Sequence, residues 1–184
     1  SLGGVCENGA CTQSFPAPVE GELVITEIMR NSIDGPDDGE FIELYNTTGA
    51  PLDINGCTLY DADSDSHLID NGAPLTIPGG GYLVLATSGD PLLNGGITPD
   101  YVYSSYYLSN TGDEVYLDCG VETIDFVVYH DDDGWPDTAG ASMSLDINAY
   151  GLDNNLVENW CDASTTYGDD TNFGSPGADN PACP

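Results

Sequence analysis

The sequence predicts an all-β domain, and two observations carry this prediction. Between residues 22 and 146, short apolar runs alternate with turns rich in Gly, Pro, Asn and Asp. No long run has the apolar periodicity of a helix. Many short strands with frequent turn signals are typical of a β-sandwich or a barrel.

The expected strands show which side chains face a core. In E-F-I-E-L-Y-N, Ile42 and Leu44 point to one side of an extended chain. Phe41, Glu43 and Tyr45 point to the other, where we interpret Glu43 as one acid among many on an outer, solvated face. The expected strands are residues 22–29, 40–46, 57–61, 74–78, 82–86, 101–108, 114–118, 122–129 and 142–146.

One hydrophobic core is expected within residues 19–184, which we interpret as a single β-sandwich domain with a C-terminal extension. Residues 1–18 are rich in Gly and Pro and are expected to be a cysteine-bearing leader or linker. Each aliphatic side chain of the core contributes about 1.5–3 kcal/mol when fully buried. The core candidates are Ile25, Ile28, Ile42, Leu44, Leu59, Leu83, Leu85, Val115, Leu117, Val127 and Leu145.

The charge restricts the partners. The chain has 32 acidic residues, one basic residue (Arg30) and a formal net charge of −31. Nucleic acids and anionic lipid surfaces are bound through Lys and Arg, so neither is expected as a partner. Membrane insertion is not expected either. Cations are the natural partners, and a salt- or calcium-rich setting would screen the self-repulsion.

The six cysteines indicate an oxidising compartment, outside the cell or at its surface. Their number is even and their spacings do not match a zinc site. We expect a local pair and two longer-range pairs, one between two strands and one that fastens the C-terminal segment. Among the fifteen possible connectivities, the predicted one is Cys6–Cys11, Cys57–Cys119 and Cys161–Cys183.

Several motifs, in order, carry a family resemblance. They are G-E-F-I-E-L-Y-N, P-L-D-I-N-G-C-T-L (51–59), L-T-I-P-G-G-G-Y-L-V-L-A (75–86), S-N-T-G-D-E-V-Y-L (109–117) and G-S-P-G-A-D-N (174–180). Together they resemble the lamin tail domain, in its secreted bacterial branch. The resemblance implies an immunoglobulin-like β-sandwich, here with irregular, disulfide-tied N- and C-terminal extensions. Lamins carry a basic second strand, whereas this chain has Glu40 and Glu43, so a chromatin-binding role is not carried over.

The segment D-A-D-S-D-S-H (61–67) predicts a calcium site. Asp61, Asp63 and Asp65 alternate directly after an expected strand, and this spacing points several oxygens at one ion when the loop curls. Asp70 is the candidate fourth ligand. The alternative is a solvated acidic loop. Two further acidic groups, at 34–40 and 131–137, are weaker candidates that we expect at one end of the sandwich.

Other chemistry has less support. His67 and His130 each lie next to an aspartate but lack a third soft ligand for zinc. The chain has no G-x-S-x-G turn for a serine nucleophile. Glu40 and Glu43 are three residues apart on a strand, so they face opposite sides and do not flank one glycosidic bond.

The tyrosines of the expected strand 101–108 have two interpretations. Tyr101, Tyr103, Tyr106 and Tyr107 are candidates for a face that binds sugar or peptide, because aromatic rings form such platforms. The alternative is ordinary sheet packing, in which aromatic residues are common.

The sequence therefore predicts a protein that is not an enzyme. Its expected role is a non-catalytic extracellular or cell-surface binding or adhesion module, with Ca²⁺ as its candidate stabilising ion. Its expected partners are cations and a surface glycan or protein. The alternative is an accessory domain of a secreted hydrolase whose catalytic domain lies outside this chain.

Overall fold

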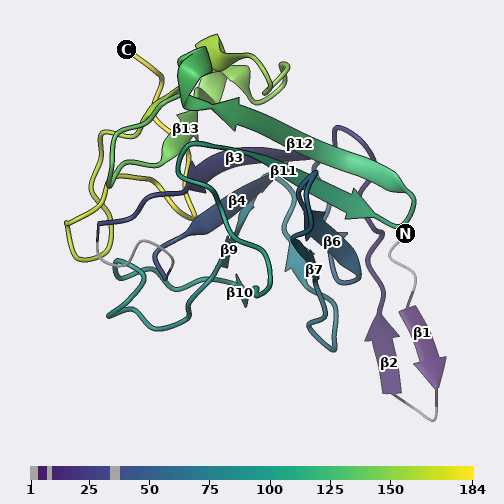
Figure 1. The fold of residues 1–184 in the computed structure, drawn as a ribbon. Coiled ribbons are helices and arrows are strands. Elements are labelled where there is room, and N and C mark those ends of the chain that lie inside the picture. Colours follow the sequence, from purple (N-terminus) through teal and green to yellow (C-terminus); the bar gives the residue numbers. More distant parts are fainter. Residues whose placement is uncertain (1–3, 8–9, 34–37) are drawn as a thin grey trace.

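The computed structural model describes residues 4–7, 10–33 and 38–184, with side chains from residue 14 onward. Two sheets pack face to face as an immunoglobulin-like β-sandwich (Figure 1). The strands are β1 (Gly4–Glu7), β2 (Ala10–Gln13), β3 (Leu23–Met29), β4 (Phe41–Asn46), β5 (Leu52–Asp53), β6 (Cys57–Tyr60), β7 (Ser66–Leu68), β8 (Thr76–Ile77), β9 (Tyr82–Ala86), β10 (Tyr101–Val102), β11 (Gly112–Cys119), β12 (Glu122–His130), β13 (Met143–Leu145) and β14 (Trp160–Asp162). Short 3₁₀ turns are η1 (Asp131–Asp133), η2 (Ile147–Ala149) and η3 (Val157–Asn159).

The larger sheet has the order β10-β9-β4-β3-β13-β14, and the smaller has the order β12-β11-β6-β7. The pairs β1-β2 and β5-β8 form two short ribbons. Neighbouring strands in the two main sheets are antiparallel except β9 and β10. The β1-β2 ribbon projects from the body of the sandwich (Figure 1).

The main core lies between the two sheets, and every predicted core residue is buried in it. The predicted Cys57–Cys119 disulfide is confirmed and joins opposed residues of β6 and β11. The predicted Cys161–Cys183 disulfide is confirmed as well. The Cys6–Cys11 prediction lies outside the described side chains. The confirmed predictions of the core and of these two disulfides were based on local sequence pattern and on the order of the expected strands.

The expected strands all overlap strands of the structure, but one was too long. Of residues 101–108 only Tyr101–Val102 is strand. The prediction did not include the short strands β5, β7 and β14, nor the backbone hairpin of β1 and β2. These elements have two to four residues each, which is too short for an alternating pattern to identify them.

The larger sheet is covered on both faces. A second, smaller apolar cluster of Met29, Phe41, Val84, Ala86 and Ile97 lies on the face away from the main core and contacts Tyr167 of the C-terminal segment. That segment folds back over β3 and β4 and is tied down by the Cys161–Cys183 disulfide. In the described part of the chain, no helix is long and apolar enough to cross a membrane.

Candidate functional site

The 61–70 loop forms a turn around the carboxylate of Asp61. Asp61 Oδ1 accepts hydrogen bonds from the backbone N–H groups of Asp63 (2.9 Å) and Asp65 (3.0 Å). Asp70 Oδ1 accepts from Gly72 N–H at 3.1 Å. Among the described residues, no three acidic, histidine or cysteine side chains are grouped so as to hold a metal ion. Calcium binding by Asp61, Asp63, Asp65 and Asp70 stays a prediction.

His67 is engaged through both ring nitrogens. Nε2 lies 2.9 Å from the Tyr101 hydroxyl, and Nδ1 accepts from Ser104 N–H at 3.3 Å. The same hydroxyl accepts from Asp70 N–H at 3.1 Å. His67 therefore fixes the loop at 101–104 against β7, which accounts for the ring without a metal.

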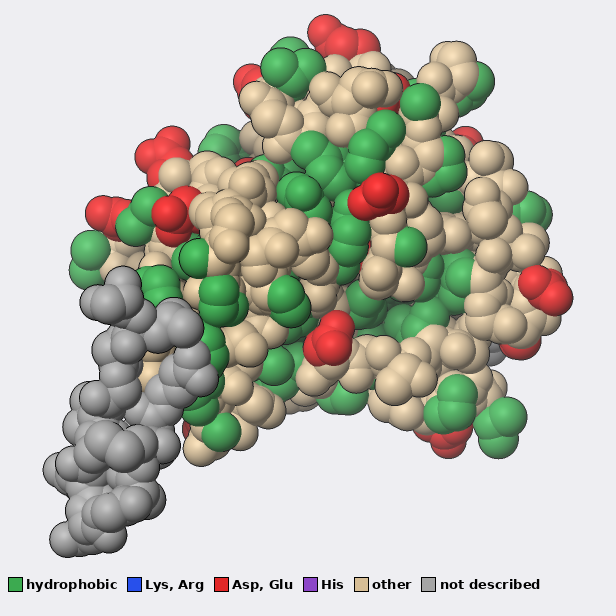
Figure 2. Space-filling view, turned by 180° about the vertical axis from the view of Figure 1, so that it is seen from behind, with side chains coloured by type: hydrophobic (Ala, Val, Ile, Leu, Met, Phe, Trp, Pro, Cys, Tyr) green, Lys and Arg blue, Asp and Glu red, His purple; other side chains and the backbone are tan. Residues whose placement is uncertain are grey.

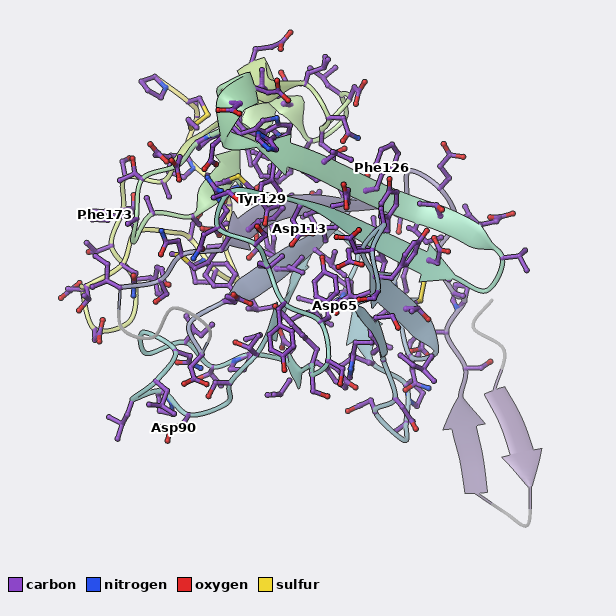
Figure 3. The ribbon with its side chains drawn as sticks, viewed as in Figure 1. Asp65, Asp90, Asp113, Phe126, Tyr129 and Phe173 are labelled. Carbon is purple, nitrogen blue, oxygen red and sulfur yellow. A yellow bond between two sulfur atoms is a disulfide. The ribbon has the colours of Figure 1, made fainter. Side chains whose placement is uncertain are left out.

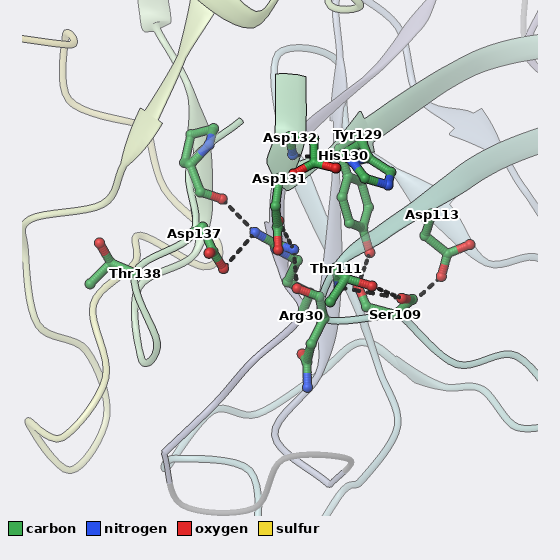
Figure 4. Close-up of polar contacts among 12 residues, drawn as sticks. Arg30, Ser109, Thr111, Asp113, Tyr129, His130, Asp131, Asp132, Asp137 and Thr138 are labelled. Carbon is green, nitrogen blue, oxygen red and sulfur yellow. Dashed lines mark hydrogen bonds and ion pairs between the residues drawn. The ribbon is translucent and has the colours of Figure 1, made fainter. Parts of the chain in front are cut away.

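Two acids of the 131–137 group, Asp131 and Asp137, bind Arg30 (Figure 4). The Arg30 guanidinium lies 2.7 Å from Asp131 Oδ1 and 3.0 Å from Asp137 Oδ1. It also donates to the carbonyl oxygens of Asn110 and Pro136. Arg30 is buried, and its guanidinium carbon lies 5.1 Å from the centre of the Tyr129 ring, a cation–π distance. Of the 34–40 group, Asp34 and Asp37 lie outside the described residues.

Of the two interpretations of the tyrosines at 101–107, packing is the correct one for Tyr103 and Tyr106, and a binding face made of all four rings is wrong. Tyr103 and Tyr106 are buried in the main core, because the chain leaves the sheet after β10 and turns their rings inward. Aromatic side chains are instead exposed on the outer face of the smaller sheet. Tyr60, Tyr116 and Phe126 occupy opposed positions of β6, β11 and β12 and stack at centroid distances of 5.0 and 5.3 Å.

A cleft with a volume of about 1090 Å³ lies between β3 and β12, where the two sheets separate. Phe126, on β12, is one of the residues that line this cleft (Figure 3). The face seen in Figure 2 is hollowed along its middle, where hydrophobic side chains are exposed between acidic ones. The lining comes from residues 19–24, 45–47, 122–126 and 150–155. It includes no basic side chain.

Asn155 covers the strand edge that borders this cleft. Its side-chain amide accepts from Val128 N–H and donates to the Phe126 carbonyl, each at 3.0 Å. These two bonds occupy the backbone groups that β12 would offer to an added strand. Strand addition to β12 at these residues is therefore blocked.

Asp125 forms part of the polar floor of the cleft. Its Oδ2 accepts from Ile25 N–H at 2.6 Å and from the Asn154 amide at 2.7 Å. Burial raises the pKa of Asp125 to about 6, although these hydrogen bonds act in the opposite direction. This carboxyl ties β12 to β3 across the gap between the sheets.

The interpretation of Glu43 as a solvated outer-face residue is wrong. Glu43 does point away from the main core, but the C-terminal segment covers it completely. Its cross-strand partner is Glu27, which is equally buried. Burial raises the pKa of Glu43 to about 9, with the neighbouring Glu27 charge as the next cause, and burial raises the pKa of Glu27 to about 7.

A β-bulge brings the two acids together, and the sequence contained a signal for it. Ile25 and Ile28 both face the main core although they are three residues apart, which strict alternation does not allow. The register between β3 and β4 shifts between Ile25 and Glu27, leaving Thr26 as the extra residue. The bulge therefore turns Glu27 away from the main core, toward Glu43.

Comparison with known families agrees with this architecture. Residues 16–131 match the family model of the lamin tail domain, a family of non-catalytic immunoglobulin-like domains. The matched range contains β3 to β12, which form the whole of the smaller sheet and four strands of the larger one, and it contains every motif of the resemblance except the one at 174–180. No curated protein matches the sequence. The two disulfides indicate an oxidising environment. Because the match covers more than half of the chain, this protein belongs to the lamin tail domain family.

Proposed function

We propose that this chain is a non-catalytic extracellular binding module of the secreted bacterial branch, and that the cleft between β3 and β12 takes a basic, extended segment of a partner protein. The observation that carries the proposal is the lining of the cleft. Glu20, Glu122 and Asp153 are exposed around it, and the apolar side chains of Val19, Phe126 and Leu152 are exposed between them.

The chemistry of a basic side chain suits this surface. Lys and Arg carry an apolar stem below a charged head, so the stem packs on an aromatic ring while the head meets a carboxylate. Phe126 is held in place because its ring stacks on Tyr116, at an interplanar angle of 12°. A net charge of −31 also attracts cationic partners over distance and speeds their association.

The test is binding of a fluorescent peptide of about twelve residues that alternates Lys with Val. One triple variant neutralises the cleft: Glu20→Gln, Glu122→Gln and Asp153→Asn. A matched variant removes three exposed acids elsewhere: Asp38→Asn, Asp63→Asn and Asp133→Asn. Each changes the net charge from −31 to −28, since three acids become neutral.

The cleft variant should weaken binding about tenfold, because exposed ion pairs contribute roughly 0.2–1 kcal/mol each. The matched variant should weaken it less than about twofold. Equal weakening in both would show that the whole acidic surface attracts the peptide, with no site in the cleft. Binding of a glycan array, with no peptide binding, would replace the basic segment with a sugar as the ligand.

A further inference from the structure

The carboxyl groups of Glu27 and Glu43 lie side by side under the C-terminal segment, on paired positions of β3 and β4. The chain has a single basic side chain outside its two histidines, and that side chain, Arg30, is bound to Asp131 and Asp137. Two buried carboxylates without a cation repel each other and lose hydration, so the pair needs another form of compensation.

Three of the four carboxyl oxygens of Glu27 and Glu43 accept hydrogen bonds from uncharged donors. Glu43 Oε1 accepts from the Thr26 hydroxyl at 2.9 Å, and Glu43 Oε2 accepts from Gly177 N–H at 2.5 Å. Glu27 Oε1 accepts from Ser175 N–H at 2.9 Å and from the Ser142 hydroxyl. Within the described residues, Glu27 Oε2 is buried and has no hydrogen-bond partner.

The other titratable groups around the pair add no positive charge. Asp100 acts on Glu43 from the loop before β10, and Tyr150 interacts with both acids. Tyr82 lies next to Tyr150 and donates to Asp179 of the covering segment at 2.7 Å. Tyr167 lies against Gly174, whose added Cβ would also meet Glu27 Oε1 at 2.6 Å. All of these groups become anionic when they lose a proton.

We propose that the buried Glu27–Glu43 pair retains at least one proton, and that this proton locks residues 174–180 onto β3 and β4. When the proton passes to solvent, two adjacent carboxylates remain in a buried site. Their repulsion and their demand for water then favour opening of the covering segment.

The segment is built around this pair. The N–H groups of Ser175 and Gly177 bind one carboxyl each, and Gly177 adopts the left-handed conformation, with φ of 85°, that this turn requires. Asn180 donates to the Thr26 carbonyl of the bulge at 2.7 Å and to the Leu145 carbonyl at 3.0 Å. Opening would separate Tyr167 and the covering chain from the second apolar cluster, which includes Phe41.

The pKa of each group supports this order of events. Because burial raises the pKa of Glu43 to about 9 and of Glu27 to about 7, the pair loses its last proton above a pH of about 9. A carboxyl that opening of the segment exposes has the ordinary pKa of 4.5, so opening releases protons between about pH 4.5 and 9. The opening equilibrium therefore rises at least about tenfold per pH unit across this range and levels off above about pH 9.

The test compares the wild type with Glu43→Gln by hydrogen exchange at matched pH. Glutamine keeps the shape of the side chain and is neutral at every pH, so it reproduces the protonated state permanently. At pH 10 the amides of Ser175 and Gly177 should exchange at least about tenfold more slowly in the variant than in the wild type. At pH 4, where Glu43 is protonated in both the closed and the open state, the two proteins should agree within about twofold. Glu158→Gln, at an exposed position of η3, is the matched control and should follow the wild type.

A second measurement does not depend on the folding of the variant. Carboxyl ¹³C NMR of the wild type should show both Glu27 and Glu43 titrating above pH 6. Midpoints below pH 5 for both, or identical exchange of the wild type and Glu43→Gln at pH 10, would overturn the proposal. Faster exchange of the two amides after chelator treatment at pH 7 would also overturn it, because a metal ion would then occupy the place assigned to the proton.

Discussion

Arg30 and the Glu27–Glu43 pair are buried ionisable groups in or next to β3 and β4, and the two sites are compensated in opposite ways. Arg30 follows β3 directly and satisfies Asp131, Asp137 and two backbone carbonyls with one guanidinium. Glu27 and Glu43 have no cation, and their carboxyl groups meet hydroxyl and backbone N–H donors instead. A chain with one basic residue can use ionic compensation only once.

The two sites should therefore respond differently to pH and to mutation. A guanidinium stays charged over the whole accessible range, so the Arg30 site is stable wherever its aspartates are ionised. The acid pair gains or loses charge within the ordinary working range. The comparison indicates that pH dependence in this domain originates where a cation is missing, and not simply where acids are abundant.

Removing the cation should have the largest effect. Arg30→Met keeps the side-chain stem but leaves Asp131, Asp137 and the carbonyls of Asn110 and Pro136 without their donor. Loss of one partner of a buried ion pair costs roughly 3–5 kcal/mol, and about 3 kcal/mol is expected here because Asp137 reaches solvent. Urea denaturation at pH 7 measures the change in the free energy of unfolding.

Arg30→Lys is the matched control for this variant. An ammonium keeps the charge but lacks the fork that reaches two carboxylates and two carbonyls, so it should recover less than half of the loss. A loss below about 1 kcal/mol for Arg30→Met would show that the Arg30 guanidinium does not stabilise the contact between the end of β3 and residues 131–137 substantially.

The acid pair should make the wild type more stable at pH 5 than at pH 8. In the unfolded chain each glutamate has its ordinary pKa of 4.5, while the folded pKa of Glu27 is about 7 and that of Glu43 is about 9. The contribution is fully present below pH 4.5 and is lost as pH rises toward the folded values. Between pH 5 and 8 the titration of Glu27 alone should lower the free energy of unfolding by about 2–3 kcal/mol.

Urea denaturation across this pH range, in the wild type and in Glu27→Gln/Glu43→Gln, separates the pair from the remaining acids. The double variant should have a flatter profile. The Arg30→Met variant should keep the slope of the wild type, because its change lies at the other site. An equal slope in the wild type and the double variant would assign the pH dependence to surface repulsion.

Calcium should have the smallest effect. For a loop site with a dissociation constant on the order of 0.1–1 mM, 1 mM calcium stabilises the folded state by about 0.4–1.4 kcal/mol. Melting in 1 mM calcium is compared with melting in sodium chloride of equal ionic strength. Asp63→Asn should remove the difference, whereas Asp133→Asn should keep it. Identical melting of the wild type in both salts would exclude calcium stabilisation by Asp61, Asp63, Asp65 and Asp70 under these conditions.

The local pattern of the sequence was sufficient to predict the main strands and the core residues. Alternation of apolar residues predicted the main strands, and the side chains of Ile42, Leu44 and Val127 occupy the core as expected. The pairing of Cys57 with Cys119 followed from the order of the strands. These features depend on periodicity and on chain order, which are properties of the sequence itself.

The environment of each acid was not predictable in the same way. Alternation correctly places Glu43 on the face away from the main core, but it does not show whether that face meets water or protein. The residue that contacts the Glu43 carboxyl on that face is Gly177, which lies 134 positions later in the chain. The same limit explains the tyrosines, because Tyr103 and Tyr106 turn into the core only after the chain leaves the sheet.

The sequence by itself determined the β-sandwich, its core, two of its disulfides and its membership of the lamin tail domain family, because these follow from side-chain period, cysteine order and motif order. Only the tertiary structure decided that Arg30 binds Asp131 and Asp137 and that Glu27 and Glu43 are buried together. The physical reason is that burial and charge compensation depend on contacts between distant segments, and a local pattern carries no information about which segment covers a given face.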